Sequence, residues 1–169
     1  ALLGDVERLA SERMVAQKYI PSLLLYPGRR KFDLRVYFMA VSDPYMVLYR
    51  DGYMRVSFST FDLRDFTDKR KHLTNMAVQE RVQQTAFEEE KDSRSQSFLA
   101  LEELLRDAFP EEPDPLNVVR CGISRAIALA FDVNPERFMQ SHRFNEGARP
   151  DVAVDRTFTL MGADFLIDQ

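Results

Sequence analysis

The segment RRKFDLRVYFMAV, residues 29–41, places charged side chains at alternate positions of a run rich in strand-forming residues. Because successive side chains of a strand point to opposite faces, Lys31, Asp33 and Arg35 share one face, and the apolar residues between them form the other. Phosphoryl transfer needs such fixed cations, because negative charge spreads over several oxygens. The row is therefore either an anion site, with Asp33 orienting a cation or contacting a ligand, or a solvated ion-pair ladder.

Residues outside this segment could also belong to such a charged site. Arg50 and Arg55 lie in the next apolar run and can add positive charge. Asp164 stands inside the apolar stretch MGADFLID, where a carboxylate should face solvent, pair with a cation or bind a metal. Magnesium sites use one or two carboxylates plus substrate phosphates. The segment KHLTN, residues 71–75, suits a turn, and His72 is either a base or a hydrogen-bonded structural residue.

Length and composition indicate one globular domain. The chain has 169 residues, of which 45% are hydrophobic and 30% charged. Its net charge of −4 argues against a general nucleic-acid binder, and no apolar run reaches transmembrane length. The single cysteine, Cys121, excludes a disulfide framework and a cysteine metal cluster. We therefore expect no nucleic-acid or membrane partner, and a reducing, intracellular compartment.

Several elements must position the charged residues. We expect a helix over 5–13, a strand over 14–19 and a clear strand over 30–41. Asp-Gly at 51–52 lies between alternating apolar runs and predicts a two-residue hairpin turn that pairs Leu48 with Arg55. That hairpin would have one apolar face, made of Val47, Tyr49, Met54, Val56 and Phe58.

The rest of the chain alternates irregular and helical patterns. Residues 59–80 read as irregular, and the polar residues 81–97 as a mobile surface segment. Two helical stripes follow, one over 98–108 and one from Pro115 to about 130. A long loop over 134–156 and a strand over 157–168 complete the pattern.

Several of these segments resemble, in order, the tubulin tyrosine ligase-like family. The matching stretches are AQKYIPSLLLYPGRRKFDLRVYFMAV, LYRDGYMRVS, DKRKHLTN and GADFLID, and the set QKYI, RKFDLR and HLTN in this order is highly specific. The resemblance is dense from about 14 to 80 and returns at 160–168. It implies an α+β, ATP-grasp-like fold, with a mainly antiparallel sheet and flanking helices. Residues 1–169 would form a single, incomplete domain, the C-terminal part of the catalytic domain.

The resemblance also implies an activity. Members of this family are ATP-dependent ligases that join an amino acid to a carboxyl group of tubulin or a similar acidic protein tail. ATP phosphorylates the carboxylate, and the amine of the free amino acid attacks the resulting acyl phosphate. The implied cofactors are ATP and Mg²⁺, and the implied location is the cytoplasm, within it the cytoskeleton or cilium.

Nucleotide contacts are assigned by position within the resemblance. Four residues would form the hinge against adenine: Gln17, Lys18, Tyr19 and Ile20. Four others would contact the rest of the nucleotide, the last two on its phosphate side: Lys31, Asp33, Thr74 and Asn75.

The remaining assigned roles are catalytic. Arg35 would lie near the phosphates or the acyl phosphate, and Arg55 would hold the carboxylate of the acceptor or of the incoming amino acid. Asp164 would ligate magnesium. On this interpretation the alternating charges of 31–35 are the nucleotide-facing side of a sheet whose other side is core.

The chain also departs from the family pattern. The Glu-x-Asn metal pair would follow Gln169 and the phosphate-covering loop and lysines would precede Ala1, so we expect this fragment alone to be inactive. Met76 and Ala77 stand where the glutamate-adding branch often has Tyr-Ser, and LLLYPGRRKFDLR looks closer to the tyrosine-adding branch. Two alternatives stay open: a non-catalytic nucleotide- or tubulin-binding module of the same family, and an unrelated ATP-grasp ligase for small molecules, against which HLTN argues.

Overall fold

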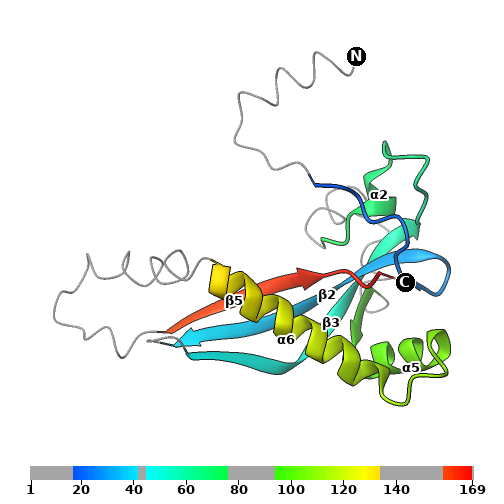
Figure 1. Ribbon diagram of the computed structural model, residues 1–169. Coiled ribbons are helices and arrows are strands. Elements are labelled where there is room, and N and C mark those ends of the chain that lie inside the picture. Colours follow the sequence, from blue (N-terminus) through cyan, green and yellow to red (C-terminus); the bar gives the residue numbers. More distant parts are fainter. Residues whose placement is uncertain (1–16, 42–44, 76–93, 134–157, 169) are drawn as a thin grey trace, which may run out of the picture.

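The computed structural model describes residues 17–41, 45–75, 94–133 and 158–168. Within these ranges one antiparallel sheet carries helices against one face (Figure 1). This arrangement confirms the predicted α+β class, with a mainly antiparallel sheet and flanking helices. No helix in the described part of the chain is long and apolar enough to cross a membrane.

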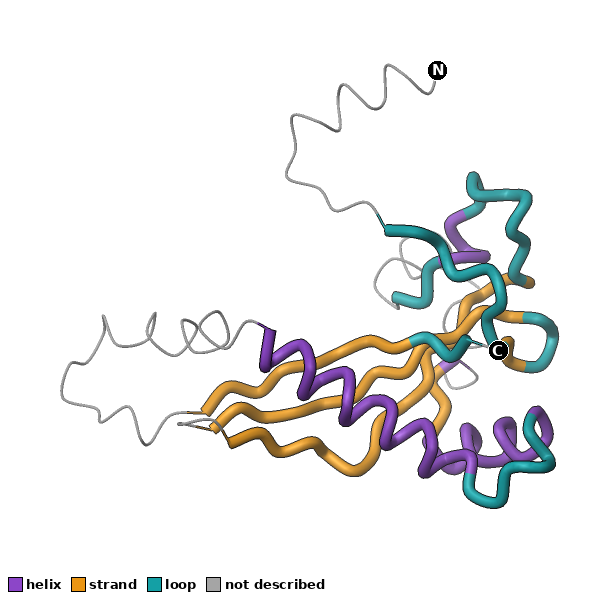
Figure 2. Tube along the Cα trace, viewed as in Figure 1, coloured by secondary structure: helices purple, strands orange, loops and turns teal. Residues whose placement is uncertain are grey.

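Within the described ranges five strands build the sheet: β1 Leu25–Tyr26, β2 Arg30–Val41, β3 Tyr45–Thr60, β4 Ser95–Ser97 and β5 Phe158–Phe165. β2 is central, because it pairs with β3 along one edge and with β1 and β5 along the other. β4 extends the sheet beyond β3. The strand from the end of the sequence, β5, therefore lies directly beside β2 (Figure 2).

Three described helices accompany the sheet: α2 Lys69–His72, α5 Phe98–Ala108 and α6 Pro115–Val133. Ser97 caps α5 by accepting a hydrogen bond from the backbone N–H of Ala100 at 3.4 Å. α6 begins at Pro115, whose fixed φ suits the first helical position, and the Asp114 carboxylate accepts from the N–H of Asn117 at 3.1 Å. Both longer helices confirm the predicted stripes.

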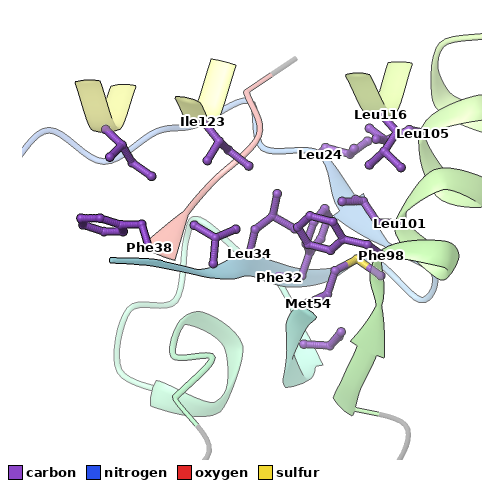
Figure 3. Close-up of a cluster of buried hydrophobic side chains, with 13 residues drawn as sticks. Leu24, Phe32, Leu34, Phe38, Met54, Phe98, Leu101, Leu105, Leu116 and Ile123 are labelled. Carbon is purple, nitrogen blue, oxygen red and sulfur yellow. The ribbon is translucent and has the colours of Figure 1, made fainter. Parts of the chain in front are cut away.

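The core lies between the sheet and these two helices. The even-numbered residues of β2 face it and are at most 6% exposed: Phe32, Leu34, Val36, Phe38 and Ala40. Figure 3 shows Leu34 facing Ile123 of α6 and Leu101 of α5 beside Phe98. Leu105 of α5 lies near Leu24 and Leu116 in the same view. Burying this apolar face fixes which side of β2 is free, since a slip of one residue would turn its charges into the core.

The hairpin predicted at Asp51-Gly52 is wrong. β3 runs unbroken through both residues, and the connection between β2 and β3 falls at 42–44, outside the described residues. Between the pairs Val36–Gly52 and Phe38–Leu48 the register shifts, because β3 contributes more residues than β2. Asp51 and Gly52 therefore belong to a bulge in a long strand, a second structure that favours glycine.

Gly52 has a packing reason to lack a side chain. A Cβ atom built there would overlap the carbonyl oxygen of Arg35, and would lie 3.0 Å from the ring of Phe98. The sheet backbone and α5 thus approach each other closely at this bulge, and the approach accounts for a glycine that the sequence alone assigns to a turn.

Continuity of β3 also changes its faces. Val47 and Tyr49 were predicted to share an apolar face with Met54 and Val56. They are instead 41% and 63% exposed, whereas Met54 and Val56 are fully buried. In an unbroken strand, odd and even positions point to opposite faces, so the two pairs separate.

Other predictions divide between confirmed and corrected. β2 and β5 confirm the strands at 30–41 and 157–168. The strand predicted over 14–19 is wrong for residues 17–19, which are the part of it that the structure describes and which have no regular structure. The strand that pairs with the start of β2 is instead β1. α2 and the end of β3 fall within the segment predicted as irregular over 59–80. The helix at 5–13 and the loop at 134–156 lie outside the described residues, as does 81–93 of the predicted mobile segment. The last four residues of that segment contain β4 and the buried Arg94.

Candidate functional site

The charged row of β2 lies on the sheet face opposite the helices. Because the even-numbered residues of β2 face the core, Asp33 and Arg35 point the other way. The strand register sets Asp33 opposite Arg55 of β3, and Arg35 opposite Asp164 of β5. Opposite residues of neighbouring strands have their Cβ atoms about 5 Å apart, so the four side chains meet on one face. We call these four residues the charged cluster.

Asp33 and Arg55 form the buried half of the charged cluster. Arg55 donates through Nε to Oδ1 of Asp33 at 2.8 Å and through Nη2 to Oδ2 at 2.6 Å. The hydroxyl of Thr74 donates to the same Oδ2, also at 2.6 Å. Asp33 is 7% exposed and Arg55 6%. This half is therefore not a solvated ladder, and each buried charge has the partner that its burial requires.

Asp164 lies between two guanidinium groups. Arg35 donates through Nε to Oδ1 at 2.5 Å and through Nη2 to Oδ2 at 3.1 Å. The Nη2 atom of Arg55 lies 2.7 Å from Oδ2. The side chains of Arg35 and Asp164 are 27% and 46% exposed. Of the three outcomes that the sequence allows for this carboxylate, the structure realises pairing with cations, and it leaves the group partly open to solvent.

These contacts set the charge states of the cluster. Burial raises the pKa of Asp164, but hydrogen bonds from Arg35 and Arg55 outweigh burial and hold this pKa below its usual value. The hydrogen bond to Asp33 raises the pKa of Arg55, and the bond to Asp164 raises that of Arg35. Arg35, Arg55 and Asp164 are thus all ionised at neutral pH.

A second set of contacts lies at the start of β2. Lys31 Nζ donates to the hydroxyl of Tyr19 at 3.3 Å, and this hydroxyl lies 2.9 Å from Nδ1 of His72. The other ring nitrogen of His72 lies 2.8 Å from the carbonyl oxygen of Asp65. Burial lowers the pKa of Lys31, and the nearby Asp33 carboxylate acts in the opposite direction. His72 therefore has the contacts of a structural residue that holds Tyr19.

Aromatic rings surround the Tyr19–His72 contact. Phe66 stacks on His72 with ring centroids 5.0 Å apart, and Phe61 stacks on Tyr19 at 6.2 Å. Sequence reasoning missed both phenylalanines, because they occur in a segment without periodicity. They fix the ring of Tyr19 beside Lys31.

The other residues predicted for the nucleotide site differ in their surroundings. Gln17 and Lys18 are exposed, Ile20 is half-buried, and Asn75 is exposed next to the buried Thr74. The structure thus brings together Lys31 with Tyr19, and Asp33 with Thr74, along one face of β2. Arg50, which the sequence also offers as a cation, is exposed at the bulge of β3.

Two tyrosines complete the surroundings of Arg35. Tyr53 lies opposite Arg35 across the β2–β3 ladder. Burial, and after it a hydrogen bond with Tyr37, raise the pKa of Tyr53. Tyr37 was visible in the sequence as the next residue of the alternating row, whereas the mistaken turn at Asp51-Gly52 hid Tyr53.

Asp164 can serve as one ligand of a magnesium ion. Among the described residues, no group of three or more His, Cys, Asp or Glu side chains could hold a metal. Mg²⁺ is commonly bound through one or two carboxylates, with waters and substrate phosphates as its other ligands. The partly exposed carboxylate of Asp164 fits this use, with cations beside it for the phosphates. The arrangement is suited to a metal–phosphate complex rather than to an all-protein metal cage.

The chain is similar to known proteins along nearly its whole length. Residues 3–169 match the model of the tubulin-tyrosine ligase family. "Probable tubulin polyglutamylase TTLL9" of Bos taurus is 47% identical over 75 residues, 43% of this chain and 16% of that protein. "Protein polyglycylase TTLL10" of Rattus norvegicus is 29% identical over 161 residues, 95% of this chain and 22% of that protein. "Inactive polyglycylase TTLL10" of Homo sapiens is 41% identical over 68 residues, 40% of this chain and 10% of that protein. The matches span between 10% and 22% of the length of these relatives.

Proposed function

The chain belongs to the tubulin-tyrosine ligase family, and from this premise we propose that the full-length protein is an ATP-dependent ligase. It would join a free amino acid to a carboxyl group of tubulin or a similar acidic protein. The carboxylate takes the γ-phosphoryl group of ATP, which leaves ADP and an acyl phosphate. The amine of the amino acid then attacks the acyl carbon, and an amide forms as phosphate leaves.

The charged cluster is the observation that carries this proposal. Lys31 and Arg35 offer cations on the face that holds Asp164, and transfer of a phosphoryl group requires fixed cations around its oxygens. When bound, Mg²⁺ would neutralise phosphate charge, and Asp164 would be one of its ligands. Tyr19, Lys31, Asp33 and Thr74 would bind the nucleotide, in agreement with their shared face.

Arg55 has a different role in this proposal from the one its position in the family pattern suggests. Its side chain is 8% exposed, and its guanidinium already contacts Asp33 and Asp164. We propose that Arg55 positions these two carboxylates, whereas Arg35, which is more exposed, meets the phosphates or the acyl phosphate. The capture of an acceptor or amino-acid carboxylate by Arg55 stays a prediction from the sequence.

The relatives' names bear on the amino acid. They name polyglutamylases and polyglycylases, so we propose glutamate or glycine ahead of tyrosine, although LLLYPGRRKFDLR resembles the tyrosine-adding branch. Tubulin as acceptor would link the protein to the cytoskeleton.

A second candidate function is a non-catalytic module that binds nucleotide or tubulin. One relative that is 41% identical over 68 residues is named an inactive polyglycylase. Similarity of this degree to the chain thus occurs in a protein that is named inactive. The two candidates differ in turnover, not in binding.

The test uses the full-length protein with tubulin, ATP, Mg²⁺ and radiolabelled glutamate, glycine or tyrosine in separate reactions. Incorporation of one label that depends on ATP supports the ligase and identifies the amino acid. Asp164→Asn is the matched control and should abolish incorporation. If no label enters tubulin while ATP still binds, the ligase proposal is wrong for this acceptor and the binding module replaces it.

A further inference from the structure

We propose that Arg35 makes the cation site at Asp164 selective for a metal ion accompanied by an anion, over a bare metal ion. The inference rests on the proposed function, because it concerns the metal and the phosphates of the same site. Its starting point is that both oxygens of Asp164 already accept hydrogen bonds from arginine, Oδ1 from Arg35 and Oδ2 from Arg35 and Arg55.

The two arginines are held unequally. The guanidinium of Arg55 is anchored by two bonds to Asp33, and its side chain is 8% exposed. The guanidinium of Arg35 is ion-paired with Asp164, the carboxylate that a metal would use, and its side chain is 27% exposed. The partner that can turn away from Asp164 is therefore Arg35, while Arg55 stays in place.

A metal ion at Asp164 must take an oxygen that Arg35 now holds. A bare divalent cation competes with the guanidinium for this oxygen, and it also meets the repulsion of a positive charge a few ångströms away. Oδ2 is also held by Arg55, whereas Oδ1 accepts from Arg35, so Oδ1 is the oxygen for which a metal would compete with Arg35. The pair thereby lowers the affinity for a metal that arrives alone.

An anion reverses this competition. A guanidinium binds the oxygens of a phosphate in the same bidentate manner in which it binds a carboxylate. A phosphoryl group near Asp164 gives Arg35 a new partner, frees Oδ1 for the metal and supplies further metal ligands. Metal and anion then favour each other's binding, and by linkage the effect is the same in both directions. In this scheme Arg35 leaves the carboxylate of Asp164 and binds the phosphoryl oxygens.

The experiment measures binding rather than turnover. Mn²⁺ is titrated into the full-length protein and followed by electron paramagnetic resonance, with and without inorganic sulfate as the anion, at constant ionic strength. The variants are Arg35→Ala, Arg35→Lys, Asp164→Asn, and Arg50→Ala as a control that removes an exposed arginine from the neighbouring strand. Circular dichroism verifies that each variant is folded.

Without sulfate, Arg35→Ala should bind Mn²⁺ about three- to fivefold more tightly than wild type, the equilibrium equivalent of a partly exposed ion pair. Sulfate should raise the affinity of wild type for Mn²⁺. In Arg35→Ala most of this increase should be absent. Arg35→Lys should be intermediate, because it keeps the charge without the fork, and Arg50→Ala should resemble wild type.

Two results would overturn the inference. In the first, Arg35→Ala binds Mn²⁺ no more tightly than wild type, while Asp164→Asn no longer binds Mn²⁺. The proposed move of Arg35 from Asp164 to the anion is then wrong, but the metal role of Asp164 and the proposed function stand. In the second, Asp164→Asn still binds Mn²⁺. Asp164 is then not a metal ligand, and the proposed move of Arg35 is wrong as well. Ligation of amino acids to tubulin is measured separately, so failure of the proposed function is distinguishable from both.

Discussion

Arg55 faces Asp33 directly across the β2–β3 ladder and donates two hydrogen bonds to its carboxylate. The same Nη2 atom lies 2.7 Å from Asp164, which belongs to the strand on the other edge of β2. One buried guanidinium thus joins acids from two strands that are far apart in the sequence. The position of Asp164 depends on this cross-strand contact, so the sheet register itself is part of the site.

The first prediction concerns the buried pair. Asp33→Asn replaces one of the oxygens that accept from Arg55 by an amide that cannot accept, and leaves a buried guanidinium incompletely paired. Breaking a buried ion pair on one side costs about 3–5 kcal/mol, and because Asp164 still contacts Arg55 we expect about 2–3 kcal/mol. The measurement is the midpoint of urea unfolding of the full-length protein.

Its control is Asp62→Asn. Asp62 pairs with Arg64, whose side chain is 91% exposed, so this loss should barely move the midpoint. Equal midpoints for the Asp33 and Asp62 variants would contradict the structural role of the Asp33–Arg55 pair.

The second prediction separates two glycines. Gly52→Ala should lower the free energy of unfolding by about 1–3 kcal/mol, because the added methyl group collides with the backbone of Arg35 and crowds Phe98. Gly122→Ala should instead stabilise by about 0.5–1 kcal/mol, since Gly122 lies exposed in α6 with no atom near the added carbon. Urea unfolding of both variants gives the comparison. A tolerated Gly52→Ala would mean that the bulge relaxes readily.

The sequence predicted the elements with strong periodicity. Alternation of apolar residues over 30–41 specifies β2 and its two faces, and the helical stripes specify α5 and α6. Asp51-Gly52 misled because the same dipeptide suits a turn and a bulge, and only contact with Arg35 and α5 decides between them. Local signals cannot contain that contact.

The candidate site was predictable in its residue types and not in its pairing. Alternation placed Lys31, Asp33 and Arg35 on one face, but the ladder that it suggested runs along β2. The observed pairs run across the sheet, from Asp33 to Arg55 and from Arg35 to Asp164. Pairing across strands depends on register, and the mistaken hairpin put Arg55 opposite the wrong residue.

The third prediction follows from the ionisation of Asp164. Burial would raise its pKa, but Arg35 and Arg55 hold it below the ordinary value. The stabilisation from this carboxylate is therefore present above the unfolded pKa of about 3.9, and it is lost as the pH falls through the lower folded pKa. Asp164→Asn should lower the urea midpoint at pH 7, and the difference from wild type should shrink toward pH 2. Asp132→Asn, on the exposed face of α6, should show no such convergence. A midpoint difference independent of pH would remove ionisation of Asp164 as its cause.

The fourth prediction tests the contact between Tyr19 and Lys31. Tyr19→Phe removes the hydroxyl that accepts from Lys31 and contacts His72, but keeps the ring that stacks with Phe61. A hydrogen bond contributes about 0.5–1.5 kcal/mol, so we expect the nucleotide affinity to fall roughly three- to tenfold. The free energy of unfolding should fall by a similar amount, because the same hydroxyl also contacts His72. Fluorescence titration of the full-length protein with an N-methylanthraniloyl derivative of ATP measures the affinity.

Tyr49→Phe is the matched control for this prediction, because Tyr49 is 63% exposed on β3 and should tolerate loss of its hydroxyl. A fall in affinity confined to Tyr19→Phe would support a nucleotide site at the start of β2, where Tyr19 orients the ammonium group of Lys31. If both variants bind the nucleotide with the same affinity, the Tyr19 hydroxyl only holds His72. It would then make no contribution to nucleotide binding by Lys31.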